Sequence, residues 1–210
     1  MCLYKRVYII GGNMGRKTTV TKEMILEAAF QILEEEGYGA VNIKTIAAKV
    51  GCSTQPISWH FGNMQQMRKS LCEYCIAKMW GGLDKEMMGE PDPAGLFFMT
   101  GKNYLSIAYD HSNVFKFLHI DAAGDMVDGK PDLISALGDP RIVKMFSAAY
   151  KISEKEIAPV IRDIIIYTHG LSTIVVQGVF DIRKEEAFAM IYNEGRQRFK
   201  AIGIDIGEMK

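Results

Sequence analysis

Apolar residues recur at spacings of three and four along almost the whole chain, and the strict alternation of a half-buried strand is rare. The first clear stripe lies where Thr21 can cap a helix and Gly37 can end it. Its members are Met24, Ile25, Ala28, Ala29, Ile32 and Leu33. The pattern predicts an all-α protein of about nine helices, with a three-helix head, a long connecting helix and a larger helical body.

Start and stop signals locate these helices. The pairs Asp92-Pro93 and Asp139-Pro140 each place an Asp cap before a Pro at the first helical position, and Ser112 can cap a shorter helix between them. We expect helices near residues 21–36, 42–50, 53–61, 63–81, 93–109, 112–119, 140–151, 153–179 and 183–202, with a loop at 121–132.

The sequence leaves the start of one helix undecided. Ser153 and Glu156 have the spacing of a capping box, and Asn63 with Gln66 repeats it at the connecting helix. Pro159 then either kinks the helix that Ser153 begins or marks the start of the next one.

Two helices of the head, at 42–50 and 53–61, are joined by the segment VGCS and have the pattern of a helix-turn-helix. The second should begin at Ser53, carry Pro56 in its first turn and be pinned to the core by Ile57 and Phe61. Its outer face then carries Thr and Gln, which can contact base edges, and Ser, Trp and His, which suit phosphate and sugar. The expected DNA contacts are Asn42, Lys44, Ser53, Thr54, Gln55, Ser58, Trp59, His60 and Asn63.

Charge changes the picture locally. The chain has 25 basic and 25 acidic residues, so any affinity for nucleic acid must come from a patch. Between Gly37 and Cys72 there are four cations and no Asp or Glu. These cations are Lys44, Lys49, Arg68 and Lys69. An imbalance of this size is commonly only a solvated face, but its coincidence with the helix-turn-helix favours DNA binding.

Residues 21 to about 70 closely resemble the DNA-binding domain of TetR-family transcriptional regulators. The segment ILEAAFQILEEEGYGAVNIKTIAAKVGCSTQPISWHFGNMQQM carries the resemblance, with Gly37-Tyr38, Ile46-Ala47 and His60-Phe61 in register. Two positions depart from the family, which commonly has Tyr in place of Ser58 and Lys in place of Met64. Both often touch phosphates, so Trp59 can take over part of that contact.

The resemblance implies a homodimer that binds a palindromic double-stranded operator and, as a repressor, is released by a small-molecule effector. It implies three parts: an N-terminal extension at 1–15, a helix-turn-helix domain at 16–62, and a ligand-binding and dimerisation domain at 63–210. Codons for Gly11-Gly12-Asn13 can spell a purine-rich ribosome-binding sequence just before Met14, so residues 1–13 are either a translated leader, with Met14 as the native start, or a real N-terminal arm.

The segment IIIYTHGLSTIVVQGVFDI resembles the penultimate helix of one TetR subgroup at His169-Gly170. In the family this helix and the last one pack against the partner's pair, so we expect an interface that includes Ile164, Thr168, Leu171, Val175, Ile191 and Phe199. The alternative is that this near-heptad stripe faces the chain's own core.

Aromatic residues spread over the middle helices suit an apolar effector pocket, although they also fill ordinary cores. The expected ligand contacts are Phe98, Tyr104, Phe115, His119, Phe146, Tyr150 and His169. Neither a metal nor a cofactor is expected, because the His residues lack metal-ligand spacing and Cys72 and Cys75 have no partner motif.

Other classes of protein fit less well. The chain lacks the G-x-S-x-G, HExxH and GxxxxGK motifs of common enzymes, so we expect no catalytic residues. A helical interaction protein with a degenerate helix-turn-helix remains an alternative. Polar residues interrupt the longest apolar tract, which favours a buried helix over a membrane span. We expect a cytoplasmic protein.

Overall fold

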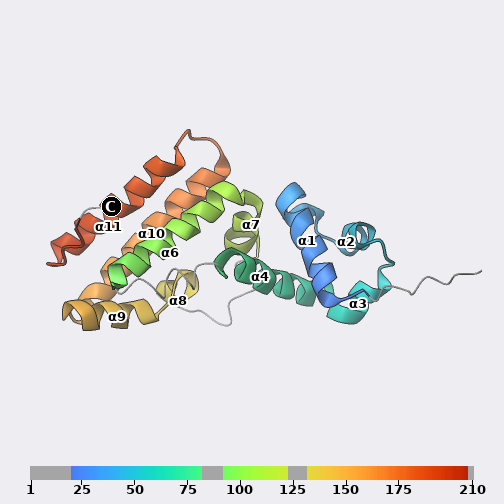
Figure 1. The fold of residues 1–210 in the computed structure, drawn as a ribbon, viewed down its shortest axis with the longest axis horizontal. Helices are drawn as coiled ribbons and strands as arrows, with labels where there is room; N and C mark the ends of the chain where they lie inside the picture. The colour runs from blue at the N-terminus through green and yellow to red at the C-terminus, as the bar shows by residue number, and fades with distance from the viewer. Residues whose placement is uncertain (1–19, 82–91, 123–131, 208–210) are drawn as a thin grey trace, which may run out of the picture.

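The computed structural model describes residues 20–81, 92–122 and 132–207, and these ranges contain ten α-helices and no strand. The predicted all-α class is confirmed, and the molecule is elongated, with the head at one end and the body at the other (Figure 1). The head holds α1 (Lys22–Glu36), the 3₁₀ turn η1 (Tyr38–Ala40), α2 (Ile43–Val50) and α3 (Gln55–Phe61), and α4 (Met64–Trp80) leads out of it. The body holds α6 (Pro93–Asp110), α7 (Ser112–Lys116), the π-helical turn η2 (Phe117–Asp121), α8 (Leu133–Leu137), α9 (Arg141–Tyr150), α10 (Glu154–Gln177) and α11 (Lys184–Ala201).

Several helix boundaries follow their predicted caps. The hydroxyl of Thr21 accepts a hydrogen bond from the Met24 amide at 3.2 Å, and Asp92 accepts one from the Gly95 amide at 3.3 Å. Asn63 caps α4 by accepting from the Gln66 amide at 2.9 Å. These short side chains satisfy amides that have no partner within the helix.

Three predicted starts are wrong by one residue. The residue before α3 is Thr54 and not Ser53, the residue before α7 is His111 and not Ser112, and α9 begins at Arg141 after Pro140. In the last case the carboxylate of Asp139 accepts from the Arg141 amide two residues on, at 2.9 Å, which is a turn contact that delays the helix. Helix α8 was not predicted, because only one turn of apolar spacing marks it.

The open question at Pro159 is settled by α10, which runs without a break from Glu154 to Gln177 with Pro159 inside it. The Glu156 carboxylate accepts from the hydroxyl of Ser153 at 2.6 Å and from its amide at 3.3 Å, which fixes the start of the helix. Helix α10 is therefore one continuous element of the body.

The head's core extends beyond the three predicted head helices. Buried side chains of α1, α2 and α3 pack with those of α4, α7 and η2, which contribute Met67, Leu71, Cys72, Cys75, Val114, Phe117 and Leu118. Phe117 lies with its ring centroid 5.0 Å from that of Tyr38. Burial raises the pKa of the Cys75 thiol to about 12, so this thiol stays protonated and packs as an apolar group.

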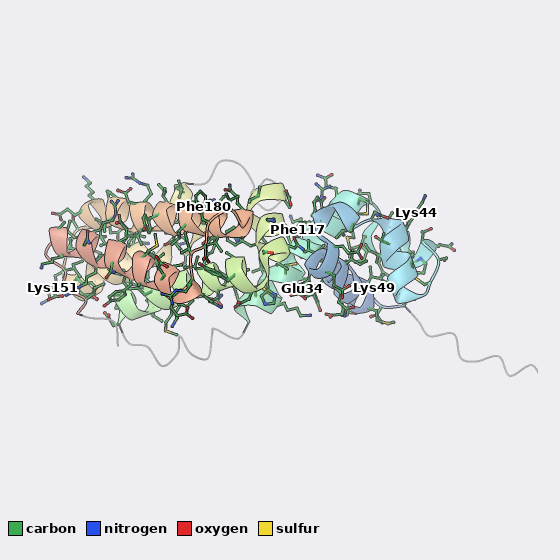
Figure 2. All side chains as sticks on the ribbon, turned by 90° about the horizontal axis from the view of Figure 1, so that it is seen from above. Glu34, Lys44, Lys49, Phe117, Lys151 and Phe180 are labelled. Atoms are coloured by element: carbon green, nitrogen blue, oxygen red, sulfur yellow. The ribbon has the colours of Figure 1, made fainter. Side chains whose placement is uncertain are left out.

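Polar contacts join the head to the body at the same place. Glu34 at the end of α1 pairs with His111, and its backbone oxygen accepts from the Asn113 amide group at 3.0 Å. Figure 2 shows Glu34 and Phe117 together at this junction, with Lys44 at the far end of the head. The head is thus held to the body by both apolar and polar contacts.

Helix α10 lies at the centre of the body and packs against α6, α9 and α11 (Figure 1). The rings of Phe97, Phe146 and Phe199 form a cluster in which Phe146 and Phe199 stack at 5.0 Å. By length and composition α10 could cross a membrane, but Ile157, Ile161 and Ile164 on it are buried in the protein core. That packing accounts for the apolar residues on the inner face of α10, whereas Ile166 and Ile174 on another face are exposed.

The residues assigned to a dimer interface lie inside the single chain. Five of the six, all but the half-buried Val175, have at most 7% of their surface exposed. They are Ile164, Thr168, Leu171, Ile191 and Phe199. Because buried side chains offer no surface to a second copy, the alternative that the stripe faces the chain's own core describes these residues.

Candidate DNA interface and effector cavity

The turn between α2 and α3 has the geometry of a helix-turn-helix. Asn42 caps α2 by accepting from the amides of Lys44 and Thr45, and Gly51 ends it at φ 74°, in the left-handed region that glycine adopts without strain. Ile57 is 1% exposed and Phe61 7%, so α3 is anchored by its inner face as predicted.

The outer face of α3 is open to solvent. Thr54, Gln55 and Ser58 are exposed, and the indole of Trp59 is 80% exposed. Ser53, in the turn before the helix, is exposed as well. Gln and Thr at the start of such a helix can form hydrogen bonds with base edges, while Ser and Trp can contact the sugar-phosphate backbone.

Three of the predicted DNA contacts already have a structural partner. The Nε2 atom of His60 lies 3.0 Å from the backbone oxygen of Val20, which ties α3 to the start of α1. Asn42 and Asn63 cap α2 and α4. These three side chains hold the helices that carry the open face.

Two of the four cations of the head contact other side chains of the chain. Lys49 pairs with Glu35 at 2.8 Å, and the guanidinium of Arg68 lies 5.1 Å from the centre of the Tyr38 ring. Lys44 is exposed at the end of the head that faces away from the body (Figure 2). The side chains of Lys44 on α2 and Lys69 on α4 are both exposed, and Lys44 lies on the helix that precedes α3.

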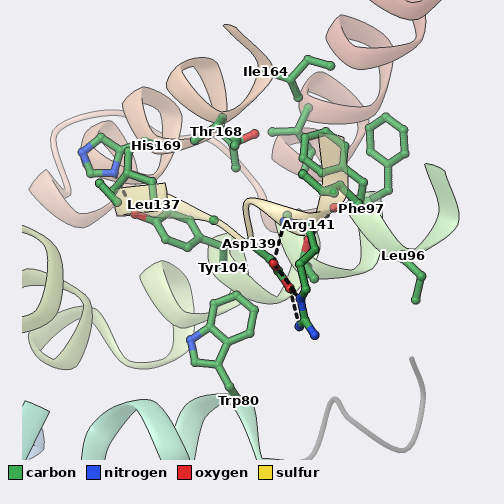
Figure 3. A pocket seen from close by; sticks show the side chains of 18 of the residues that line it. Trp80, Leu96, Phe97, Tyr104, Leu137, Asp139, Arg141, Ile164, Thr168 and His169 are labelled. Atoms are coloured by element: carbon green, nitrogen blue, oxygen red, sulfur yellow. Dashed lines mark hydrogen bonds and ion pairs between the residues drawn. The ribbon is translucent and has the colours of Figure 1, made fainter. Parts of the chain in front are cut away.

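A cavity of about 500 Å³ lies in the body between α4, α6, α9 and α10 (Figure 3). Of the predicted ligand contacts, Phe98, Tyr104, His119 and His169 line it. Phe115 and Phe146 are fully buried in the core, and the hydroxyl of Tyr150 donates to Asp92 at 2.5 Å. Phe115, Phe146 and Tyr150 do not line the cavity. The prediction included them because an aromatic side chain alone does not distinguish a core position from a position in a cavity wall.

Sequence reasoning missed other parts of the wall. Trp80 and Ile76 at the end of α4 line the cavity, as does Arg141 at the start of α9. Ile164, Thr168 and Ile191, which were assigned to a dimer interface, line it too. Trp80 is one of two tryptophans in the chain and the last residue of α4, and a large aromatic side chain at a helix end is a signal for such a wall.

Few polar groups face this cavity. The hydroxyl of Tyr104 lies 2.7 Å from Nδ1 of His169, and the two side chains lie side by side in Figure 3. Burial raises the pKa of Tyr104 and lowers that of His169, so both rings are uncharged at neutral pH. Asp139 and Arg141 form an ion pair with one another, at 2.5 Å between Oδ2 and Nη2.

No group of three or more His, Cys, Asp or Glu residues that could hold a metal ion occurs within residues 20–81, 92–122 and 132–207. In that part of the chain, the arrangement offers an exposed DNA-type surface and a separate apolar cavity.

Comparison with known proteins gives a profile match for the head and a similarity in fold for most of the chain. Residues 25–71 match the sequence profile of the bacterial regulatory proteins of the tetR family. The chain is similar in fold to a TetR variant from Acinetobacter baumannii AYE in complex with minocycline, at 14% identity and a TM-score of 0.56, over 87% of this chain and 98% of that one. It is also similar to a transcriptional regulator from Rhodococcus sp. RHA1, at 14% identity and a TM-score of 0.52, over 85% and 96% of the two chains. No curated protein matches the chain significantly.

Proposed function

We propose that this chain is a member of the tetR family of bacterial regulatory proteins, whose profile its N-terminal head matches, and that it is a repressor released by a small molecule. It binds a palindromic operator as a homodimer, and the effector occupies the cavity of the body. The observation that carries the proposal is the exposed face of α3, where Gln55 and Trp59 lie on a helix anchored by buried residues.

In this proposal the side chains of α3 divide the work of DNA binding. Thr54 and Gln55, at its start, contact base edges in the major groove. Ser58 and Trp59, about one turn later, contact the sugar-phosphate backbone, and Lys44 on α2 neutralises a phosphate. Ser53 at the turn lies close enough in sequence to add a further backbone contact.

Helix α4 connects the two sites. Its first half places Met67 and Leu71 in the core of the head, and its end places Ile76 and Trp80 in the cavity wall. A ligand that contacts Trp80 in one position of α4 and not in another shifts the head by its difference in affinity for the two states. The minocycline complex of the A. baumannii relative supports a small-molecule ligand for a protein of this fold.

Dimerisation is assigned to the outer face of α10. Ile166 is 47% exposed and Ile174 38%, with Gly170 between them on the same face. A Cβ added to Gly170 would meet nothing within 4 Å beyond its chain neighbours and the adjacent backbone of its own helix, so a partner helix can approach closely there. Phe180, beyond the end of α10, is a further exposed apolar side chain, with 58% of its surface open (Figure 2).

The dependence of DNA affinity on salt tests the head. Each phosphate neutralised contributes about 0.9 to the slope of log K against log salt concentration. We expect Lys44→Ala to reduce this slope by about 1 in fluorescence anisotropy titrations of a labelled duplex. Lys49→Ala, on the same helix but paired with Glu35, is the matched control and should leave the slope almost unchanged. Equal slopes for the wild type and the Lys44 variant would remove Lys44 from the interface.

A further inference from the structure

The π-helical turn η2 faces two parts of the molecule at once. It is widened by a hydrogen bond of 2.9 Å from the Ala122 amide to the Phe117 carbonyl, which spans five residues. Phe117 and Leu118 on this turn are buried in the core of the head, whereas His119, the next residue, lines the cavity of the body. Turns of this kind are rare in helices and occur often at functional sites.

His119 is surrounded by rings. The centre of its imidazole lies 4.7 Å from that of Tyr104, 4.8 Å from that of Phe115 and 6.3 Å from that of His169. Its Nε2 atom is buried and has no hydrogen-bond partner among the described residues. Burial, and then the neighbouring His169, lower the pKa of His119 to about 4, so the imidazole is neutral at pH 7.

A buried polar atom without a partner is unfavourable, and such atoms are rare in folded proteins. The nearby polar pair does not relieve it, because Tyr104 and His169 already form a hydrogen bond with one another. The Nε2 atom of His119 is therefore available to a group that enters the cavity.

The charges of the wall restrict what can enter. Among the described residues that line the cavity, only Asp139 and Arg141 are charged, and they pair with one another. The Arg141 side chain is 83% exposed, so the pair lies at the solvent side of the wall. An ionised ligand would lose its hydration inside this cavity and gain no opposite charge there.

We propose that the effector of this protein is an uncharged, mainly aromatic or apolar molecule with a hydroxyl group that forms a hydrogen bond with Nε2 of His119. A hydroxyl satisfies either tautomer of a neutral imidazole, since it can donate to a bare nitrogen and accept from a protonated one. The cavity of about 500 Å³ is within the range that holds drug-sized ligands. The inference rests on the proposed function and specifies its effector.

The same contact gives the effector a route to the head. His119 lies two residues from Phe117, whose ring packs on Tyr38 of the head. A ligand that draws His119 toward the cavity acts on the same turn that holds this contact. His119 is thus assigned two roles: it recognises the hydroxyl of the effector, and it transmits effector binding to the head.

Fluorescence of Trp80 can report ligand binding directly. The chain has two tryptophans, and a Trp59→Phe background leaves Trp80 in the cavity wall as the single reporter. The probes are biphenyl, 4-phenylphenol and biphenyl-4-carboxylate, which share one apolar body. We expect 4-phenylphenol to bind about 3- to 10-fold more tightly than biphenyl, and the carboxylate to bind more weakly than either.

The His119→Phe variant completes this test. In it the preference for 4-phenylphenol over biphenyl should fall to about 1-fold or below, because the partner of the hydroxyl is gone. A preference that persists in the variant, a carboxylate that binds most tightly, or no binding by any probe up to its solubility would each overturn the proposal.

Thermal unfolding of the ligand-free protein gives a second, independent test. His119→Phe removes a buried polar atom without a partner and should raise the melting temperature. His169→Phe is the matched control, since it breaks the hydrogen bond to Tyr104 and should lower the melting temperature. A lower melting temperature for both variants would show that His119 has a partner in the free protein and would overturn the proposal.

DNA binding of the wild type, followed by anisotropy without any probe, separates this inference from the proposed function. If the wild type binds DNA but shows no preference for 4-phenylphenol over biphenyl, only the proposed effector chemistry is contradicted. Absence of DNA binding contradicts the proposed function itself.

Discussion

Trp59 shows most clearly how the residues of α3 divide between structure and function. Ile57 and Phe61 on either side of it are buried, whereas the indole is four-fifths exposed beside His60, at 4.7 Å between ring centres. A large aromatic surface held in water by a well-packed helix stabilises nothing in the free chain. In the proposed function this surface contacts DNA, next to Ser58, where TetR-family regulators commonly have a tyrosine.

At the same scale, Gln55 tests whether the head distinguishes base sequences. Gln55→Ala should cost about 1–3 kcal/mol on the preferred operator and much less on operators altered at the contacted base pair, because a two-way hydrogen bond to adenine is lost. Anisotropy titrations against a panel of single-base-pair operator variants measure this. Ser58→Ala is the control, and it should weaken all operators equally. A uniform loss in the Gln55 variant as well would make that side chain a backbone contact.

Single residues of the head show which contacts the sequence could predict and which it could not. The anchors and the open face of α3 were expected from spacing and confirmed by burial. The roles of His60 and Lys49 were not foreseen, because their partners Val20 and Glu35 lie far away along the chain. Contacts across tertiary structure leave no local pattern in a single sequence.

Among the elements, α1 and α4 are joined by a polar contact centred on Glu27. Its carboxylate accepts from Lys78 at 2.8 Å, from the hydroxyl of Tyr74, and from Gln31 at 2.9 Å. These hydrogen bonds, with Lys78 first, lower the pKa of Glu27 to about 2. Since α4 leads from the head to the cavity, this contact helps to hold it in place at the head.

This contact predicts a dependence of stability on pH. The pKa of Glu27 in the folded chain lies below the ordinary value of 4.5 for a glutamate, so its contribution to stability is fully present above about pH 4.5 and is lost as pH falls toward 2. Glu27→Gln should lower the free energy of unfolding at pH 7 by about 1 kcal/mol, a value reduced by the partial exposure of the carboxylate. Denaturant titrations between pH 7 and pH 3 test this, with the exposed Glu73 changed to Gln as control. An unchanged pH profile in the Glu27 variant would contradict it.

The ends of several helices were predictable from the sequence, whereas the neighbours that each helix packs against were not. Caps and glycine ends located α1, α2 and α4, because these signals act within a single turn. The direction faced by α10 was not predictable, since a helix at the centre of a body and a helix at a dimer interface show the same near-heptad stripe. The cavity wall was missed for a related reason, as Thr168 and Ile191 differ from core residues only in what lies opposite them.

For the whole molecule, the elongated shape places a DNA-type surface at one end and an apolar surface on α10 in the body (Figure 1). A dimer formed through the body would hold two heads at a fixed separation. Heads of this type bind half-sites one turn of DNA apart, about 34–36 Å, or a multiple of it.

A charge on the outer face of α10 tests this assembly. Ile166→Glu should convert the dimer to monomers, because two like charges would be buried near the symmetry axis. Sedimentation equilibrium measures the change, and Leu133→Glu, a similarly exposed position on α8, is the control. A wild type that is monomeric, or a variant that stays dimeric, would assign the exposed face of α10 another role.

The central claim is that the head recognises a particular DNA sequence, and selection of genomic DNA fragments by the purified protein tests it most directly. We predict that sequencing of the retained fragments shows enrichment of one palindromic sequence, and that Gln55→Ala changes or abolishes this enrichment. Retained fragments that share no sequence, or a sequence that is selected equally well by the Gln55 variant, would contradict the account.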